Sequence, residues 1–272
     1  MSNIALTHEQ YWSEVWSSNE HEARAVCPDR VGYLEREYYQ FFSGALAGCG
    51  GSLLEVGCGS SKWMPYFAHK FGFQVSGIDY SQVGCMQASE LLRQAGVAGE
   101  VLHRDALAEN RDICERFDVV ISLGLVEHFT DTSEITRSLA RYVKPGGLLI
   151  STSPNLAGIL GCIQQLLNRP VYDVHVPFTL GQLIDGHRQA GLQVERATYL
   201  GGLDFHELNL LGTPGSTKWL TSRVLMRLSR MGWMAPFSVP RSRRWSSAMG
   251  VVALKPNGST RLRPGDVGKV CA

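Results

Sequence analysis

The sequence predicts an α/β fold with a doubly wound, mostly parallel, seven-stranded sheet. Strand-like runs alternate with helical patterns, which is typical of βαβ units. A glycine-rich turn after the first run indicates a ligand site at a strand end. The 272 residues suffice for one large α/β domain with additions. The strand-like runs are 52–56, 73–79, 100–104, 117–123, 147–153, 192–200 and 248–254.

Segments outside this alternation divide the chain into further parts. Thr7 and Gln10 have capping-box spacing and predict a helix start near the N-terminus. Nearly fifty residues separate the last two strand-like runs and predict a helical insertion. The expected parts are an N-terminal helical lid (1–47), a ligand-binding core (48–204), the insertion (205–245), the last strand of the core (246–256) and a flexible tail (257–272).

Composition narrows the possible classes of protein. Hydrophobic residues make up 44% and charged residues 19%, as in ordinary globular domains. A net charge of +1 gives no basic field for nucleic acid, so we expect no nucleic-acid partner. Seven scattered cysteines without a C-x-x-C pair indicate reduced thiols and a cytoplasmic protein. The sequence has no run of about 18 apolar residues, so we expect no transmembrane helix. The oligomeric state is not determined by these features.

The most informative segment is the glycine-rich turn. Leu53–Ser61 reads Leu-Leu-Glu-Val-Gly-Cys-Gly-Ser-Ser, an apolar strand followed by an acidic residue and Gly-x-Gly. Because Gly57 and Gly59 lack side chains, a ligand can lie on the backbone near the positive end of the next helix. Lys62 stands where a dinucleotide site needs a small residue. Glu55 favours a cationic ligand over a pyrophosphate.

Three more landmarks follow in order. Asp79 ends the second strand and Asp105 follows the third. In the turn 144–147, Lys-Pro-Gly-Gly, proline is expected to end a helix and the glycine pair to return the chain to the sheet. With Glu-x-Gly-x-Gly, these features resemble the class I S-adenosylmethionine (SAM)-dependent methyltransferases over about residues 45–200 and the final strand. The resemblance implies a Rossmann-like fold, SAM as cofactor and S-adenosylhomocysteine (SAH) as product.

The resemblance also implies where SAM lies. The glycine turn approaches its methionine part, and Glu55 faces the amino group through water or backbone. Asp79 is expected to bind both ribose hydroxyls; the alternative is that it caps the following helix, although Ser81 can do so. Asp105 is expected to read the adenine amino group, or else to make a loop turn. The expected cofactor contacts are Glu55, Gly57, Cys58, Gly59, Asp79, Tyr80, Asp105, Ala106, Leu123 and Gly124.

Few groups are placed to take a proton from a methyl acceptor. Glu127 and His128 follow the fourth strand, and His175 follows the fifth strand and a helix. Histidine, with an ordinary pKa of about 6.5, suits proton uptake near neutrality. Each histidine also has a structural alternative, holding a loop or packing beneath a helix. We expect Glu127, His128 and His175 to be catalytic, with Glu127 as a scaffold or acceptor-orienting residue rather than a base. In-line displacement is then assisted by a histidine base or by positioning alone.

The sequence Val126-Glu127-His128 resembles a signature of the ubiquinone-biosynthesis O-methyltransferases and of the small-RNA 3′-end methyltransferases. In those groups Glu-x-x-Glu-His and a later histidine can hold a divalent metal. Here Gly124 stands at the first Glu position, so we expect no metal. The expected function is methyl transfer from SAM to an O or N of a small-molecule acceptor. The alternatives are a metal-assisted RNA 3′-end methyltransferase and a non-catalytic SAM-binding regulator.

Two regions of the sequence are candidates for covering the cofactor or the substrate. The N-terminal aromatic residues are candidates for a lid over SAM, with packing by their apolar faces as the alternative. The insertion carries Lys218, Arg223, Arg227 and Arg230 on one side of a helical pattern. It is interpreted as a substrate lid, a dimer contact, a solvated face, or a peripheral contact with anionic membrane through 218–244. The aromatic residues are Tyr11, Trp12, Trp16, Tyr38 and Tyr39.

Overall fold

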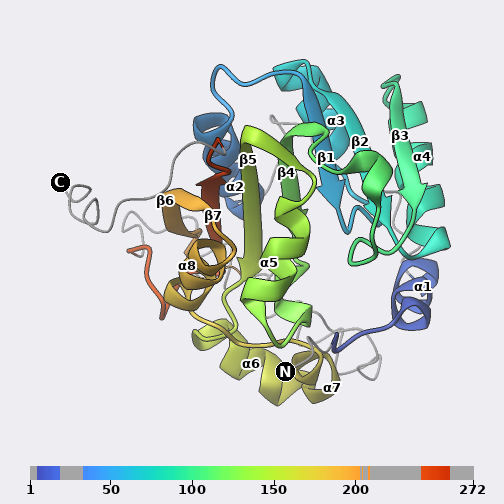
Figure 1. The fold of residues 1–272 in the computed structure, drawn as a ribbon. Helices are drawn as coiled ribbons and strands as arrows, with labels where there is room; N and C mark the ends of the chain where they lie inside the picture. The colour runs from blue at the N-terminus through green and yellow to red at the C-terminus, as the bar shows by residue number, and fades with distance from the viewer. Residues whose placement is uncertain (1–4, 19–32, 203, 205–207, 209–239, 258–272) are drawn as a thin grey trace.

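A computed structural model describes residues 5–18, 33–202, 204, 208 and 240–257 (Figure 1). Its centre is a seven-stranded sheet in the order β3-β2-β1-β4-β5-β7-β6. The strands are β1 (Ser52–Val56), β2 (Gln74–Asp79), β3 (Gly99–His103), β4 (Phe117–Leu123), β5 (Val143–Pro154), β6 (Gln193–Leu200) and β7 (Ala248–Leu254).

The strand pairing makes the sheet mostly parallel. The first five strands, β1 through β5, are all parallel to their neighbours in the order β3-β2-β1-β4-β5. Strand β7 runs antiparallel to both β5 and β6. The chain moves outward through β2 and β3 and then returns to β4 on the other side of β1. Ligands of such sheets lie beyond the carboxyl ends of the strands where the order reverses. The fold therefore places its site above β1 and β4, and the predicted α/β class is confirmed.

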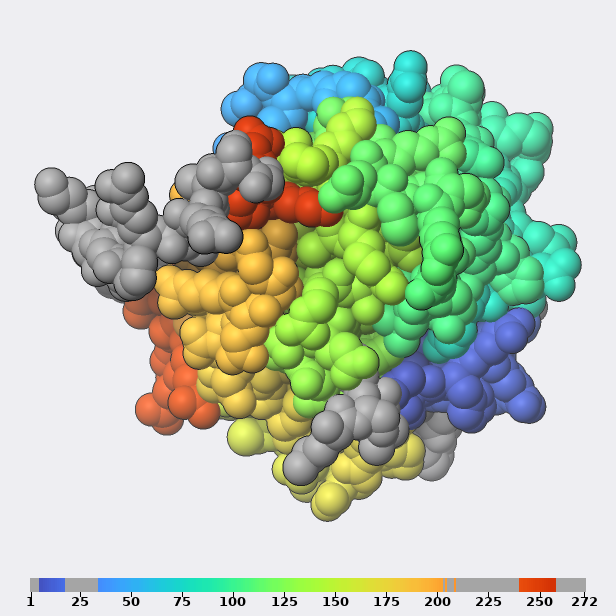
Figure 2. Space-filling view, viewed as in Figure 1, coloured from blue at the N-terminus to red at the C-terminus, as the bar shows by residue number. Residues whose placement is uncertain are grey.

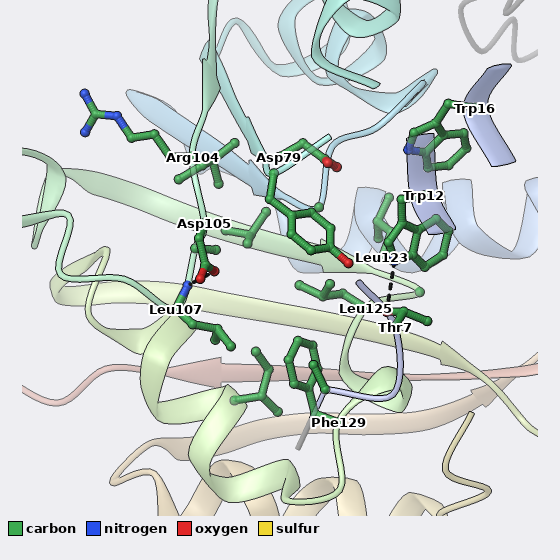
Figure 3. Close-up of a pocket in the computed structure, with 18 residues that line it drawn as sticks. Thr7, Trp12, Trp16, Asp79, Arg104, Asp105, Leu107, Leu123, Leu125 and Phe129 are labelled. Carbon is green, nitrogen blue, oxygen red and sulfur yellow. Dashed lines mark hydrogen bonds between the residues drawn. The ribbon is translucent and has the colours of Figure 1, made fainter. Parts of the chain in front are cut away.

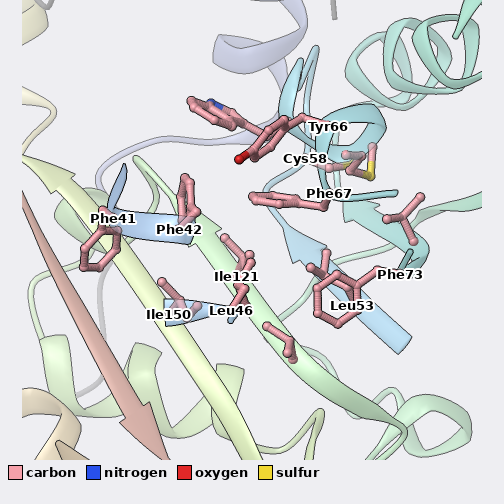
Figure 4. Close-up of a cluster of buried hydrophobic side chains, with 14 of the residues drawn as sticks. Phe41, Phe42, Leu46, Leu53, Cys58, Tyr66, Phe67, Phe73, Ile121 and Ile150 are labelled. Atoms are coloured by element: carbon pink, nitrogen blue, oxygen red, sulfur yellow. The ribbon is translucent and has the colours of Figure 1, made fainter. Parts of the chain in front are cut away.

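Helices cover both faces of the sheet (Figure 1). Phe42 and Phe67 join one buried core, whose aromatic packing against the sheet is drawn in Figure 4, and Ile135 and Leu183 join the other. Full burial of such a side chain stabilises the fold by about 1.5–3 kcal/mol. The helices are α1 (Glu9–Ser18), α2 (Tyr33–Ala45), α3 (Trp63–Phe71), α4 (Gln82–Gln94), α5 (Thr132–Ala140), α6 (Ile159–Leu167), α7 (Arg169–Asp173) and α8 (Leu180–Gln189).

The first helix starts differently from the prediction. The His8 side chain, not Thr7, caps α1, because its Nδ1 accepts a hydrogen bond from the Tyr11 amide at 3.1 Å. Thr7 Oγ1 instead accepts from the Trp12 indole N–H at 3.0 Å. The predicted capping box is therefore wrong. In Figure 2, α1 forms the dark blue patch at the lower right edge of the molecule, and it contacts α4.

The Lys-Pro-Gly-Gly segment also differs from the prediction. α5 ends at Ala140, so Pro145 does not end it. Val143 already pairs with Phe117, and pairing resumes five residues later at Leu148. The four residues are thus a bulge inside β5, which adds residues to one strand only. Gly146 makes this possible with φ 81°, a conformation that glycine adopts at no steric cost.

Two predicted parts lie largely outside the described residues. Of the insertion 205–245, the structure describes 208 and 240–245, and the predicted basic helix lies outside the described residues. Of the tail 257–272 it describes Asn257. Among the helices that are described, none has the length and apolar character needed to cross a membrane.

Candidate active site

Two cavities meet above the carboxyl ends of β1 and β4. Cavity A, of about 220 Å³, extends from the glycine turn to the ends of β2 and β3 (Figure 3). Cavity B, of about 540 Å³, lies between α2, the start of α3 and the ends of β4 and β5. Leu123 and Gly124 line both cavities. The end of β4 is therefore where a ligand in cavity A approaches a molecule in cavity B.

The glycine turn has the backbone that the sequence predicts. Gly57 has φ 74° and Gly59 has φ 25°, both in the left-handed region. The amides of Gly57 and Cys58 donate to the Ile78 carbonyl at 2.9 and 3.2 Å, which fastens the turn to β2. Gly57 lines cavity A. Gly59 lies beneath the Trp16 indole, which would overlap any side chain at this position.

Asp79 lies at the end of β2, in the wall of cavity A. Its Oδ2 accepts from the Gly59 amide at 2.8 Å, and its Oδ1 accepts from the Ser81 amide at 2.7 Å. The residue is 6% exposed, and burial raises the pKa of its carboxyl group. Ser81 caps α4 by accepting from the Gly84 amide at 3.3 Å. Asp79 is therefore not needed to cap α4, and each of its carboxylate oxygens can accept a further hydrogen bond from a ligand in cavity A.

Glu55 lies beneath the turn and lines neither cavity. Its Oε2 accepts from the Ser61 hydroxyl at 2.8 Å, which holds the far end of the turn. The residue is 1% exposed. Burial raises the pKa of Glu55 to about 8, with the Ser61 hydrogen bond opposing the shift and the charge of Asp79 adding to it. Glu55 is therefore mostly neutral near pH 7, and its contact with the SAM amino group through water or backbone stays a prediction.

This burial predicts a pH effect on stability. Because the folded-state pKa of Glu55 lies above its ordinary value, the folded protein binds a proton that the unfolded chain has released. The stability from this group is complete below about pH 4 and is lost as pH rises towards 8. Between pH 6.5 and 8, the free energy of unfolding is expected to fall by up to about 1.4 kcal/mol per pH unit.

Glu55→Gln removes the titrating group while keeping the Ser61 hydrogen bond. Thermal melts of both proteins at pH 6.5 and 8 measure the effect. The melting temperature of the wild type is expected to drop more than that of the variant. Equal drops would show that Glu55 does not titrate in this range.

Asp105 follows β3 and lines cavity A on the side away from Trp16 (Figure 3). Its Oδ1 accepts from the Leu107 amide at 2.8 Å, which is the loop turn considered as its alternative role. The residue is exposed and lines the cavity, so the turn holds its carboxylate in place without covering it. Tyr80 and Ala106 line the same cavity.

The expected cofactor contacts therefore separate into two groups. One group lines cavity A: Gly57, Asp79, Tyr80, Asp105, Ala106, Leu123 and Gly124. Glu55, Cys58 and Gly59 do not; they build the turn from below. Trp12 and Trp16 of α1 also line cavity A, with rings stacked at 5.5 Å, and Tyr38 lines cavity B. Tyr11 and Tyr39 line neither.

The three predicted catalytic residues come together behind Gly124. One ligand atom from each of Glu127, His128 and His175 lies within 4.8 Å of the others. None of the three lines cavity A or B. Gly124 has φ 64°, and a Cβ atom there would stand 3.4 Å from Glu127 Oε1. The absence of a side chain at 124 leaves the Glu127 carboxylate next to the junction of the cavities.

Hydrogen bonds fix the orientation of both imidazoles. Nδ1 of His128 lies 2.8 Å from the Val174 carbonyl, and Nδ1 of His175 lies 2.6 Å from the Val171 carbonyl. A carbonyl only accepts, so each Nδ1 carries a proton and each Nε2 presents a lone pair. Burial lowers the pKa of His128 to about 3, with the neighbouring His175 adding to the shift. Burial also lowers the pKa of His175.

This donor set fits a divalent metal in its chemistry. Two neutral imidazoles and a carboxylate are ligands of catalytic zinc sites, which keep a fourth position open. A metal bound here would be held by Glu127, His128 and His175 and would act as a Lewis acid near the junction. The expectation of no metal stays a prediction.

Cavity B contains residues that sequence reasoning missed. Glu35 comes from α2, Lys62 and Trp63 from the start of α3, and Asp204 from beyond β6. They are far apart in sequence, so no local spacing identifies them. Lys62 alone carried a signal, because a lysine at the third position of the glycine register is unusual for a dinucleotide site.

Comparison with known proteins agrees with this geometry. Residues 53–147 match a family model described as a methyltransferase domain. A ubiquinone biosynthesis O-methyltransferase from Pseudomonas putida strain F1 is 32% identical over 199 residues, covering 70% of this chain and 81% of the relative. Its counterpart from Pseudomonas fluorescens strain SBW25 is 33% identical over 154 residues, which cover 54% of this chain and 66% of the relative, just under two thirds.

Solved structures share the fold at low sequence identity. Geranyl diphosphate C-methyltransferase from Streptomyces coelicolor, solved with Mg²⁺, geranyl diphosphate and SAH, has a TM-score of 0.61 at 12% identity, covering 91% of this chain and 97% of that one. The [4+2]-cyclase SpnF has a TM-score of 0.62 at 16% identity, covering 94% and 98%. The fold, with its mostly parallel sheet, is Rossmann-like. The chain belongs to the class I SAM-dependent methyltransferases.

Proposed function

We propose that this methyltransferase moves a methyl group from SAM to a hydroxyl oxygen of a small molecule. The observation that carries the proposal is the junction at Leu123 and Gly124, where two cavities meet in front of a cluster of proton acceptors. A hydroxyl must lose its proton when it is methylated, so such a cluster suits an oxygen acceptor. The relatives' names, ubiquinone biosynthesis O-methyltransferase, support the same atom and acceptor class.

In this proposal cavity A holds SAM. Asp79 accepts hydrogen bonds from the ribose hydroxyls, and Asp105 accepts from the adenine amino group. Gly57 and Gly124 leave room for the methionine part and the sulfonium. Bound SAM supplies an activated methyl group on a positively charged sulfur. The chain itself aligns the acceptor with the methyl group for in-line displacement. Holding two reactants in this geometry lowers the free-energy barrier of the reaction.

The cluster behind Gly124 handles the proton. Glu127 Oε1, beside the junction, accepts a hydrogen bond from the acceptor hydroxyl and orients it. His175 is the better final base of the two histidines, because it is less buried than His128. Burial lowers the pKa of His128, so this residue stays neutral and keeps its position beside His175 without taking the proton. The proton leaves the oxygen as the new carbon–oxygen bond forms.

An SAH-release assay tests this function. The protein is incubated with SAM and fractions of small metabolites, and SAH is measured. SAH formation that depends on a hydroxylated metabolite is expected. The regulator alternative predicts SAH binding without any acceptor-dependent release.

The cluster also supports a second candidate, metal-assisted methyl transfer to an RNA 3′ end. Its ligand atoms are near enough to share one metal ion. The net charge of +1 argues against an RNA partner.

Chelation distinguishes the two candidates. Under the main proposal, turnover of the small-molecule acceptor is expected to be unchanged after treatment with EDTA and removal of the chelator. Recovery of lost activity on adding Mg²⁺ or Zn²⁺ would instead support metal assistance. Mg²⁺-dependent labelling of an RNA end would favour the second candidate outright.

A further inference from the structure

The N-terminal segment 5–18 lies against the loop that follows β4. The Leu6 amide donates a hydrogen bond to the His128 carbonyl at 2.8 Å, and Ala5 forms an antiparallel bridge with Phe129. The same segment continues into α1, which contacts α4, and it also lines cavity A. One short stretch of chain therefore touches both cavity A and the loop that carries two members of the proton-accepting cluster.

Within this segment, Trp12 makes the contact between the two sites. Its ring stacks on the Trp16 ring, with centroids 5.5 Å apart, and both rings line cavity A. It also meets the His128 imidazole edge to face, at 5.0 Å and an interplanar angle of 87°. The Trp12 indole N–H donates to Thr7 Oγ1, which fixes the ring in this position (Figure 3). Because edge-to-face packing of two rings is favourable, Trp12 opposes a rotation of the His128 ring.

His128 in turn holds the loop that carries His175. Its Nδ1 donates to the Val174 carbonyl at 2.8 Å, and the Val176 amide donates to the Glu127 carbonyl at 2.6 Å. The centroids of the two imidazole rings are 4.4 Å apart. The loop is thus fastened to residues 127 and 128 on both sides of His175, so a displacement of His128 also displaces the proposed base.

We infer that Trp12 is a positioning residue, which holds His128, and through it His175, in the orientation that takes the proton of the methyl acceptor. The inference rests on the proposed function, because it assumes that His175 is the base. Trp12 lines cavity A and not cavity B, so it acts through His128 and not on the acceptor. SAM bound in cavity A rests against the Trp12 ring, so the cluster is held most firmly when the methyl donor is present.

Four proteins test the inference: the wild type, Trp12→Leu, Trp12→Phe and the control Tyr11→Leu. Turnover is measured as SAH release at saturating SAM, with the metabolite fraction that supports it best in the wild type, and SAH affinity by calorimetry. Trp12→Phe keeps an aromatic ring beside His128 but loses the N–H that donates to Thr7. Tyr11 is next to Trp12 on α1 and lines neither cavity, so its variant removes an aromatic ring from the same helix.

Trp12→Leu is expected to lower turnover at saturating SAM by about 10-fold, because a small misplacement of a reacting group lowers the rate steeply. Its SAH affinity is expected to fall less than its turnover. Trp12→Phe is expected to recover most of the lost turnover, and Tyr11→Leu is expected to keep wild-type turnover. Wild-type turnover of Trp12→Leu, or equal losses in both Trp12 variants, would overturn the inference.

A double variant separates the inference from the proposed function. In a His175→Ala protein, Trp12→Leu is expected to cause no further loss of turnover, because two residues that act through one group are not additive. A further 10-fold loss would overturn the inference alone. Full turnover of His175→Ala by itself would overturn the proposed route of the proton. A wild type that releases no SAH with any metabolite fraction would overturn the proposed methyl transfer.

Discussion

Asp79→Asn is expected to weaken SAH binding by on the order of 100-fold. Hydrogen bonds from ribose hydroxyls to a carboxylate are charge-assisted, and a neutral amide loses about 1–1.5 kcal/mol for each of two such bonds. The same carboxylate accepts from the Gly59 and Ser81 amides, and an asparagine amide group can accept only one of them. The variant is therefore also expected to be less stable, by about 1–3 kcal/mol.

Asp118→Asn separates the loss of binding from the loss of stability. Asp118 also accepts from a backbone amide, that of Ser52 at 2.8 Å, and it pairs with Lys144. It lies near the start of β4, away from cavities A and B. Its variant is expected to melt earlier but to bind SAH with wild-type affinity. An Asp79 variant that binds SAH as tightly as the Asp118 variant would remove Asp79 from the site.

His175→Ala is expected to reduce turnover by on the order of 100-fold while leaving SAH affinity unchanged. A positioned base contributes about 10²–10⁴ to the rate, and His175 is too far from cavity A to line it. Burial lowers its pKa below the ordinary value, which favours the neutral form that accepts a proton. Wild-type turnover limited by this group is therefore expected to rise less between pH 6.5 and 8 than it would with an unperturbed histidine base.

The control for this variant is His69→Ala, in the exposed last turn of α3. It is expected to keep full turnover. Full turnover of both His175→Ala and Glu127→Gln would exclude the cluster from the reaction and leave catalysis by positioning alone. Weaker SAH binding by His175→Ala would indicate a structural role instead.

The sheet could be predicted because its signals are local. The run from Leu53 to Gly59 combines a buried strand with left-handed glycines, and α3 begins shortly after it at Trp63, so each signal depends on near neighbours in sequence. The positions of Asp79 and Asp105 in the wall of one cavity could be predicted because parallel strands end at one edge of a sheet, where the residues at their ends gather. Their contacts with SAM stay predictions.

What could not be predicted depends on contacts between distant segments. The bulge in β5 arises because Val143 pairs with Phe117, a partner that local sequence does not reveal. The sequence places Glu55 at the end of a strand but does not reveal that tertiary packing buries it beneath the turn and raises its pKa. The Glu35–Lys62 pair joins α2 to α3, and only the folded chain shows the two charges together.

The most direct test of the account is the mass of the product formed from SAM with a trideuterated methyl group. The account predicts a small hydroxylated acceptor that gains one labelled methyl, with fragment ions placing the label on oxygen. Product is expected to decrease in His175→Ala and to persist in His69→Ala. A label on nitrogen, carbon or RNA, or no labelled product from a protein that binds SAH, would contradict it.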